Sequence, residues 1–157
     1  MDSEEQGLTP RTTMEQEVQK LLESQGLGVL ATSGPHGAHA SLVAFAASRD
    51  LGSLILATPM TTRKYANLEH DPMVALLVDN RSNQRSDCHA ALAATGYGRA
   101  GAVQDQQRRA WLELYLEKHP HLVDFVQAPS CALVVISVVR YSVVRAFQQV
   151  SELVLSP

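Results

Sequence analysis

Residues 27–58 read LGVLATSGPHGAHASLVAFAASRDLGSLILAT, and this stretch decides the fold. Three apolar runs, at residues 27–32, 38–47 and 53–58, are separated by the turn-forming sequences GPHG and RDLG. Turns this short join antiparallel neighbours, because a parallel pair needs a crossover of about a dozen residues or more. The stretch therefore predicts three adjacent antiparallel strands.

The rest of the chain continues in the same style. Further strands are expected at residues 73–78, 89–102, 131–144 and, more weakly, 146–155. Gly96 and Gly98 predict a bend or bulge in the second of these. The pattern predicts a mainly β protein, a six- to seven-stranded antiparallel barrel with peripheral helices, and not a doubly wound α/β sheet.

Three helical segments accompany the strands. Thr13 is expected to cap the first, with Gln16 completing a capping box. Pro59 is expected to open the second, which runs to about His70, because proline suits a first helical turn. The third spans residues 104–118. The domain organisation expected is a flexible tail at 1–12 followed by a single domain at 13–157.

Composition excludes several classes of function. A net charge of −3 gives no general attraction for nucleic acid or an anionic membrane. Cys88 and Cys131 are too few for a disulfide framework, and no histidine has a carboxylate or cysteine partner at metal-ligand spacing. Residues 1–20 lack the apolar core of a signal peptide, and the longest apolar run is too short to span a membrane. These features predict a soluble cytoplasmic protein without a metal site.

One segment, residues 58–68, carries residues typical of ligand chemistry. It reads TPMTTRKYANL, and a predicted strand ends and a predicted helix begins within it. Cations are unfavourable at a helix N-terminus, yet Arg63 and Lys64 stand there side by side. A bound phosphate would explain the pair, since it accepts hydrogen bonds from helix amides, hydroxyls and both cations. The simpler alternative is two side chains that point into water.

The stretch from residue 29 to 78 resembles the pyridoxamine 5′-phosphate oxidase-like superfamily, the FMN-binding split barrels. The resemblance rests on LATSGPHGAHASLVAFA and SLILATPMTTRKYANLEHDPMVALLV, and continues more weakly through DNRSNQRSD and ATGYGRAGAV. It implies a split-barrel fold, an FMN cofactor and a homodimer with the flavin near the interface.

The resemblance also implies which residues contact the cofactor. The strand along the flavin contributes Ser41 and Val43. The phosphate end of the flavin is contacted by Thr58, Thr62, Arg63 and Lys64. A loop that reaches the cofactor across the dimer interface contributes Asn83 and Gln84. Val43 is expected to contribute backbone groups.

The chain departs from the family's named enzyme at its C-terminus. It ends in SELVLSP and has its only tryptophan, Trp111, in the third predicted helix, so the tryptophan-and-arginine segment of true pyridoxamine phosphate oxidases is absent. The resemblance thus implies an FMN-dependent oxidoreductase of unknown substrate and electron donor, with no catalytic side chain identified. Two alternatives stay open: a flavin-binding carrier or sensor, and a split barrel that binds haem or the deazaflavin F420.

Overall fold

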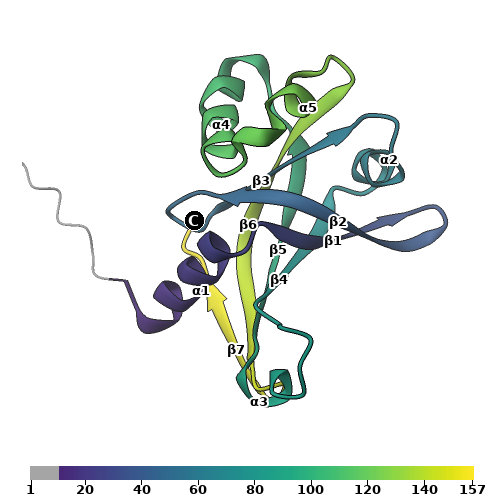
Figure 1. The fold of residues 1–157 in the computed structure, drawn as a ribbon. Coiled ribbons are helices and arrows are strands. Elements are labelled where there is room, and N and C mark those ends of the chain that lie inside the picture. The colour runs from purple at the N-terminus through teal and green to yellow at the C-terminus, as the bar shows by residue number, and fades with distance from the viewer. Residues whose placement is uncertain (1–10) are drawn as a thin grey trace, which may run out of the picture.

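Seven antiparallel strands lie in the order β3-β2-β1-β4-β5-β6-β7, and a further pairing of β3 with β6 closes the first six into a barrel (Figure 1). The computed structural model describes residues 11–157. The strands are β1 (Leu27–Gly34), β2 (Gly37–Ala47), β3 (Ser53–Pro59), β4 (Met73–Asp79), β5 (Leu92–Ala102), β6 (Cys131–Arg145) and β7 (Gln149–Val154). The expected antiparallel barrel is confirmed, and β7 extends it as an extra strand on β6.

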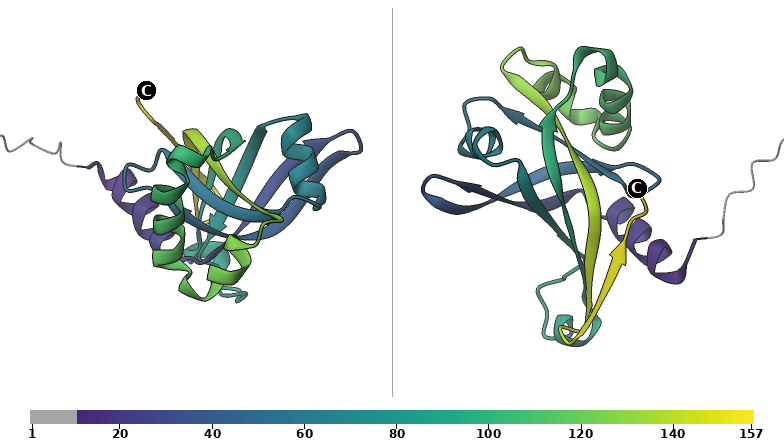
Figure 2. Two further views of the ribbon diagram at one scale, coloured as in Figure 1. Left: turned by 90° about the horizontal axis from the view of Figure 1, so that it is seen from above. Right: turned by 180° about the vertical axis from the view of Figure 1, so that it is seen from behind.

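Helices cover the outside of this barrel (Figure 2). They are α1 (Thr13–Ser24), α2 (Arg63–His70), α3 (Asp87–Ala90), α4 (Asp105–Lys118) and α5 (Val123–Gln127), with a 3-10 turn at Pro120–Leu122. α1 inserts Val18, Leu21 and Leu22 into the barrel core. None of the helices in residues 11–157 is long and apolar enough to cross a membrane.

Alternation along β3 divides the apolar side chains between two cores. Leu54 and Leu56 point into the barrel, whereas Ile55 and Ala57 lie in a second cluster with Tyr115 of α4. A strand buried on both faces reads as a continuous apolar run, which explains the sequence SLILAT. β3 is therefore packed on both faces up to Thr58, the predicted site residue on this strand.

The barrel is split where β2 and β3 part. These two strands pair only over residues 45–47 of β2 and 54–56 of β3. β3 pairs with β6 along its whole length, while residues 37–44 of β2 form a hairpin with β1. Figure 1 shows α2 between the end of β3 and this hairpin, so the helix bridges the two separated edges.

The predicted cap of α1 and the predicted start of α2 are wrong, although α1 itself begins at Thr13. The cap of α1 is Thr12, whose side chain accepts the amide of Glu15, instead of Thr13 with Gln16. Pro59 is the last residue of β3, paired with Cys131, and does not open a helix. α2 begins at Arg63, because the hydroxyl of Thr62 accepts its first-turn hydrogen bond.

The remaining strand predictions agree with the structure except at two starts, and the last strand begins at Gln149 and not at Ala146. The pairing of β5 with β6 shifts register between Tyr97 and Gly98, which confirms the predicted irregularity. The strand itself starts at Leu92 and not at His89, because α3 occupies residues 87–90. Residues 1–10 of the predicted flexible tail lie outside the described residues.

Candidate functional site

The N-terminal end of α2 is fastened to the end of β3 by two threonine hydroxyls. Thr62 Oγ1 lies 2.9 Å from Thr58 Oγ1 and donates to the Pro59 carbonyl at 2.9 Å. It also accepts from the amide of Tyr65 at 3.3 Å. Thr58 Oγ1 also lies 3.3 Å from the Pro59 carbonyl, and either hydroxyl can be the donor in the contact between the two threonines. The cap residue is thereby fixed in orientation, with Thr58 only 1% exposed behind it.

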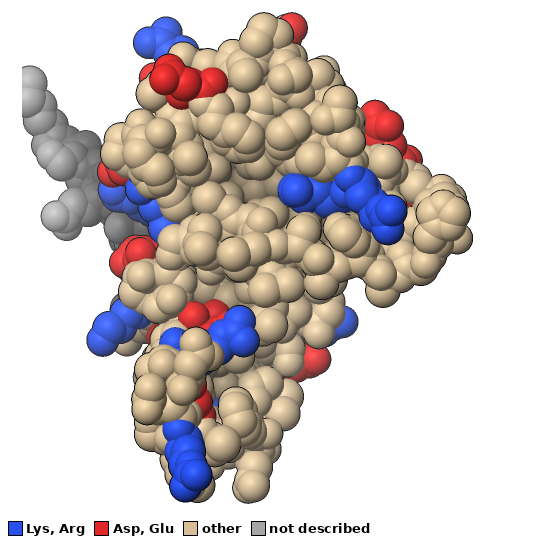
Figure 3. Space-filling view, turned by 45° about the vertical axis from the view of Figure 1, so that its right-hand side comes forward, with Lys and Arg blue, Asp and Glu red and all other residues tan. Residues whose placement is uncertain are grey.

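Two cations follow the cap. Arg63 is exposed and Lys64 half-buried, and within residues 11–157 neither forms an ion pair with a carboxylate. Amides in the first turn of a helix have no acceptor within it, and the helix dipole adds partial positive charge there. Figure 3 shows Lys and Arg side chains gathered on the side of the molecule that carries α2. The N-terminal end of α2 is therefore electrostatically positive and favourable for an anion.

The other helices show that this charge distribution is particular to α2. Four of them have an acidic residue in the first turn, as the dipole favours. These residues are Glu15, Asp87, Asp105 and Asp124. The first turn of α2 contains none.

Strand β2 presents one buried hydroxyl and one unpaired edge. The side chain of Val43 is buried in the barrel core, so only its backbone is available to a ligand. Ser41 Oγ is buried and has no hydrogen-bond partner among the described residues. Residues 37–44 pair with β1 on one side and meet no strand of residues 11–157 on the other. Unsatisfied polar groups of this kind are costly unless a ligand or water completes them.

A second polar contact holds α2 at its other end, and it involves residues that the sequence did not single out as functional. Asn67 of α2 and Thr32 of β1 are both buried, and Asn67 Nδ2 donates to Thr32 Oγ1 at 3.1 Å. Burial of two polar side chains at positions distant in sequence is a tertiary feature. The one local signal is an asparagine inside a helix, where its propensity is poor.

Asn83 and Gln84 lie away from this site within one chain. Their loop precedes α3, which Figure 1 places at the opposite end of the long strands from α2. Both side chains are exposed. The structure therefore brings together Thr58, Thr62, Arg63 and Lys64, but does not bring Asn83 or Gln84 to them in the same chain.

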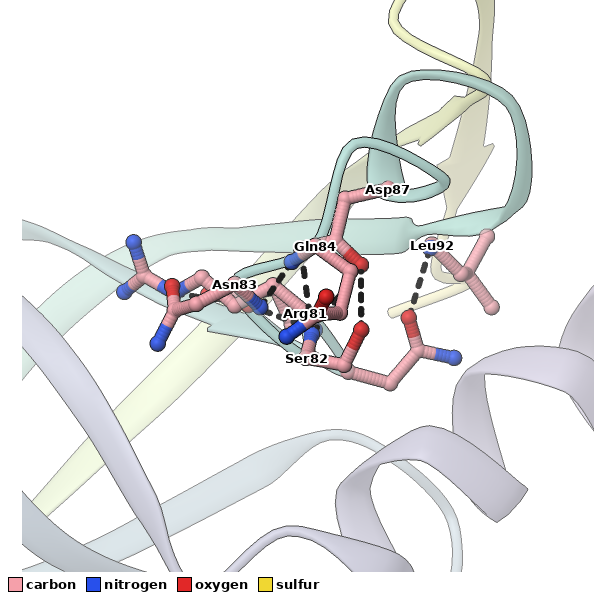
Figure 4. A network of polar contacts seen from close by, with 8 residues as sticks. Arg81, Ser82, Asn83, Gln84, Asp87 and Leu92 are labelled. Carbon is pink, nitrogen blue, oxygen red and sulfur yellow. Dashed lines mark hydrogen bonds and ion pairs between the residues drawn. The ribbon is translucent and has the colours of Figure 1, made fainter.

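The loop that carries Asn83 and Gln84 is nevertheless ordered by one carboxylate (Figure 4). Asp87 accepts hydrogen bonds from the amides of Ser82, Asn83 and Gln84 and from the hydroxyl of Ser82, at 2.8–3.3 Å. These hydrogen bonds lower the pKa of Asp87 below its usual value, and the bond from the Ser82 amide has the largest effect. Asn83 has a φ of 62°, so this carboxylate holds a backbone conformation that few residues adopt.

Comparison with known proteins identifies the family. The model of the pyridoxamine 5′-phosphate oxidase family matches residues 14–145. No curated protein sequence matches the chain significantly. Within residues 11–157, no three His, Cys, Asp or Glu side chains are grouped to hold a metal ion.

Solved structures support the same fold at low sequence identity. A heme binding protein from Mycobacterium smegmatis has a TM-score of 0.81 at 20% identity, covering 93% of this chain and 60% of that one. A general stress protein 26-related protein of the pyridoxinephosphate oxidase family, from Clostridium acetobutylicum, has a TM-score of 0.71 at 14% identity, and the match covers 90% of this chain and 94% of that one. A FAD-binding protein from Mesorhizobium loti has a TM-score of 0.66 at 16% identity, and the match covers 85% of this chain and 94% of that one. This chain thus spans less than two thirds of the first of them.

Proposed function

Because the chain belongs to the pyridoxamine 5′-phosphate oxidase family, we propose that it binds FMN through the phosphate at the N-terminus of α2. The observation that carries this proposal is the pair of cations, Arg63 and Lys64, in a first turn that holds no carboxylate. A phosphate there accepts charge-assisted hydrogen bonds from both side chains and from the free amides of the turn.

The rest of the site fits the flavin ring. The unpaired edge of β2 offers backbone donors and acceptors, and Ser41 Oγ lacks a partner on the same strand. Both features lie where the barrel splits, within the β1–β2 hairpin that α2 contacts through Asn67 and Thr32. We assign ring contacts to Ser41 and the backbone of Val43, and phosphate contacts to Thr62, Arg63 and Lys64. Thr58 supports the phosphate end through Thr62.

Bound FMN would supply hydride or electron transfer, and the protein would supply binding, orientation and shielding. We propose on this basis an FMN-dependent oxidoreductase whose substrate and electron donor the site does not name. No acid or base stands at the site, since the described side chains around it are hydroxyls, an amide and two cations. A flavin carrier or sensor uses the same residues, and turnover of NADH or NADPH by the flavin-loaded protein separates an enzyme from a carrier.

Haem is the second candidate ligand. The M. smegmatis structure with the highest TM-score given above is that of a heme binding protein, and it shares the fold of this chain. F420, which also has a phosphate, remains a third. The visible absorbance spectrum of freshly purified protein tests all three, because flavin, deazaflavin and haem absorb differently. A haem spectrum, or a protein that does not take up added FMN, would refute the proposal.

We also propose a homodimer in which Asn83 and Gln84 reach the partner's flavin. Supporting it is an exposed apolar surface on the outer face of the sheet, where Leu42, Met73 and Val139 are 65%, 54% and 57% exposed. A shallow cavity of about 410 Å³ lies on this face, lined in part by Ala75 and Tyr97. Exposed apolar patches on a sheet commonly mark a protein interface.

Sedimentation tests the dimer. The expected mass is twice the 17.1 kDa of the chain, and Leu42→Glu should shift it toward the monomer. Val123→Glu is the matched control, because Val123 is also an exposed apolar residue but lies on α5. Asn83→Ala should weaken flavin binding without dissociating the dimer. A wild-type monomer that binds FMN tightly would refute the dimer and leave the phosphate site intact.

A further inference from the structure

Asn67 connects α2 to both strands of the β1–β2 hairpin. Its Nδ2 donates to Thr32 Oγ1 at 3.1 Å, and Thr32 Oγ1 in turn donates to the carbonyl of His39 at 3.5 Å, the long end of hydrogen-bonding range. Asn67 is 6% exposed and Thr32 3%. A buried amide costs free energy unless it is hydrogen-bonded, so this chain of contacts has one favourable arrangement.

Gly34 makes room for this asparagine. A Cβ added at Gly34 would overlap Asn67 Oδ1 and lie 2.7 Å from Asn67 Cγ. The backbone of Gly34 is not in the left-handed region, unlike that of Gly37 with its φ of 100°. Glycine at position 34 is therefore required by the space that Asn67 occupies and not by the turn.

The two ends of α2 are thus tied to different parts of the split barrel. Thr62 joins its start to Thr58 of β3, and Asn67 joins its second turn to β1. Leu68 also packs into the core, but an apolar contact has no preferred direction. Hydrogen bonds at both ends fix the direction of a helix of eight residues, and with it the place where the first-turn amides and Lys64 point.

We infer that Asn67 is a positioning residue, which aims the N-terminus of α2 at the flavin phosphate through Thr32. This inference rests on the proposed phosphate site. Asn67→Ala should lower affinity for FMN about tenfold, the value of one lost hydrogen bond, and leave affinity for riboflavin unchanged. Riboflavin lacks the phosphate, so the ratio of FMN affinity to riboflavin affinity reports how well α2 is oriented toward the phosphate.

Gly34→Ala provides a test that keeps the amide. Alone, it should displace Asn67 and lower FMN affinity as Asn67→Ala does. In the Asn67→Ala background it should add no further loss, because the overlapping atoms are gone. Thr32→Val changes little volume and removes the hydroxyl that accepts from Asn67 and donates to the His39 carbonyl, so it tests the same connection if Asn67→Ala does not fold. Gln19→Ala is the control, since the side-chain amide of Gln19 donates to Glu23 Oε1 within α1, outside the proposed site.

Hydrogen exchange in the flavin-free protein gives a second readout. Asn67→Ala and Thr32→Val should speed amide exchange within residues 63–70 and leave the barrel strands as in the wild type. Unchanged exchange in α2 would overturn the inference, and so would an unchanged ratio of FMN to riboflavin affinity in folded variants. If the wild type itself does not prefer FMN to riboflavin, the proposed phosphate site fails instead, and exchange alone then decides whether Asn67 fixes α2.

Discussion

Replacing Arg63 or Lys64 with alanine should separate flavin affinity from protein stability. A hydrogen bond to a charged group contributes about 1.5–3 kcal/mol, so each loss should weaken FMN binding by about 10- to 150-fold. In the flavin-free protein, by contrast, losing the cation should not lower the unfolding free energy. An exposed cation at a helix N-terminus is unfavourable by about 0.3–1 kcal/mol, and Arg63 has no ion pair to lose within residues 11–157. Arg63→Ala should therefore leave the unfolding free energy unchanged or raise it slightly.

The assay combines two titrations with one unfolding curve. FMN and riboflavin are titrated into flavin-free protein by fluorescence quenching, and urea unfolding is measured on the same samples. Both variants should lose affinity for FMN and keep the affinity of the wild type for riboflavin. Arg109→Ala is the control, because Arg109 is an exposed arginine of α4 whose ion pair with Glu113 lies on the helix surface.

Two results would refute the reasoning. Unchanged FMN affinity in both variants would mean that the phosphate binds elsewhere. Equal losses for FMN and riboflavin would mean that the cations support the ring or the fold and not the phosphate. Increasing salt should weaken FMN binding to the wild type more than to either variant, since ions screen exposed charges.

Three further predictions concern the scaffold. Burial lowers the pKa of His119, whose Nε2–H donates to the Phe45 carbonyl at 2.7 Å. Below pH 6.5 the unfolded chain therefore binds a proton at this histidine that the folded chain does not bind. The urea midpoint of unfolding should fall as the pH is lowered from 7 to 5, and it should fall less in His119→Gln. Thr62→Ala should cost about 1 kcal/mol of unfolding free energy through loss of the helix cap, and Thr62→Ser should retain most of it. Tyr141→Phe should cost about 1–3 kcal/mol, because its buried hydroxyl donates to the Leu51 carbonyl at 2.6 Å and that acceptor would be left unpaired; a loss well under 1 kcal/mol would show that water replaces it.

The sequence predicts the strands of this barrel well, because local patterns determine them. Apolar runs, short turns and glycine pairs are local, and each predicted strand is present within a few residues. Helix starts are less predictable, since several threonines near Thr12 and Thr62 satisfy the same capping rule and packing selects among them. The segment with Arg63 was predictable because it breaks a local rule.

Other parts of the site depend on the tertiary structure and could not be predicted in this way. Asn67 and Thr32 are 35 residues apart, and their contact follows from where α2 crosses the hairpin. The missing partner of Ser41 Oγ is likewise visible only once its neighbours are placed. Asn83 and Gln84 were predicted from family resemblance, and a single chain holds them away from α2, so the contact expected of them requires the proposed second subunit.

Deviations from favourable local chemistry gather at one end of this barrel. Cations occupy the first turn of α2, Ser41 Oγ is buried without a partner, and β2 has an unpaired edge beside the split. Each of these features costs stability in the flavin-free protein, and the proposed ligand, FMN, would supply a phosphate and hydrogen-bonding groups to all three. Proteins retain such costs mainly where function requires them. FMN should consequently raise the thermal midpoint more than riboflavin does at the same ligand concentration, because stabilisation grows with the ratio of ligand concentration to Kd and the phosphate should lower Kd. Differential scanning at one fixed ligand concentration tests this, and equal shifts would show that the phosphate adds no affinity.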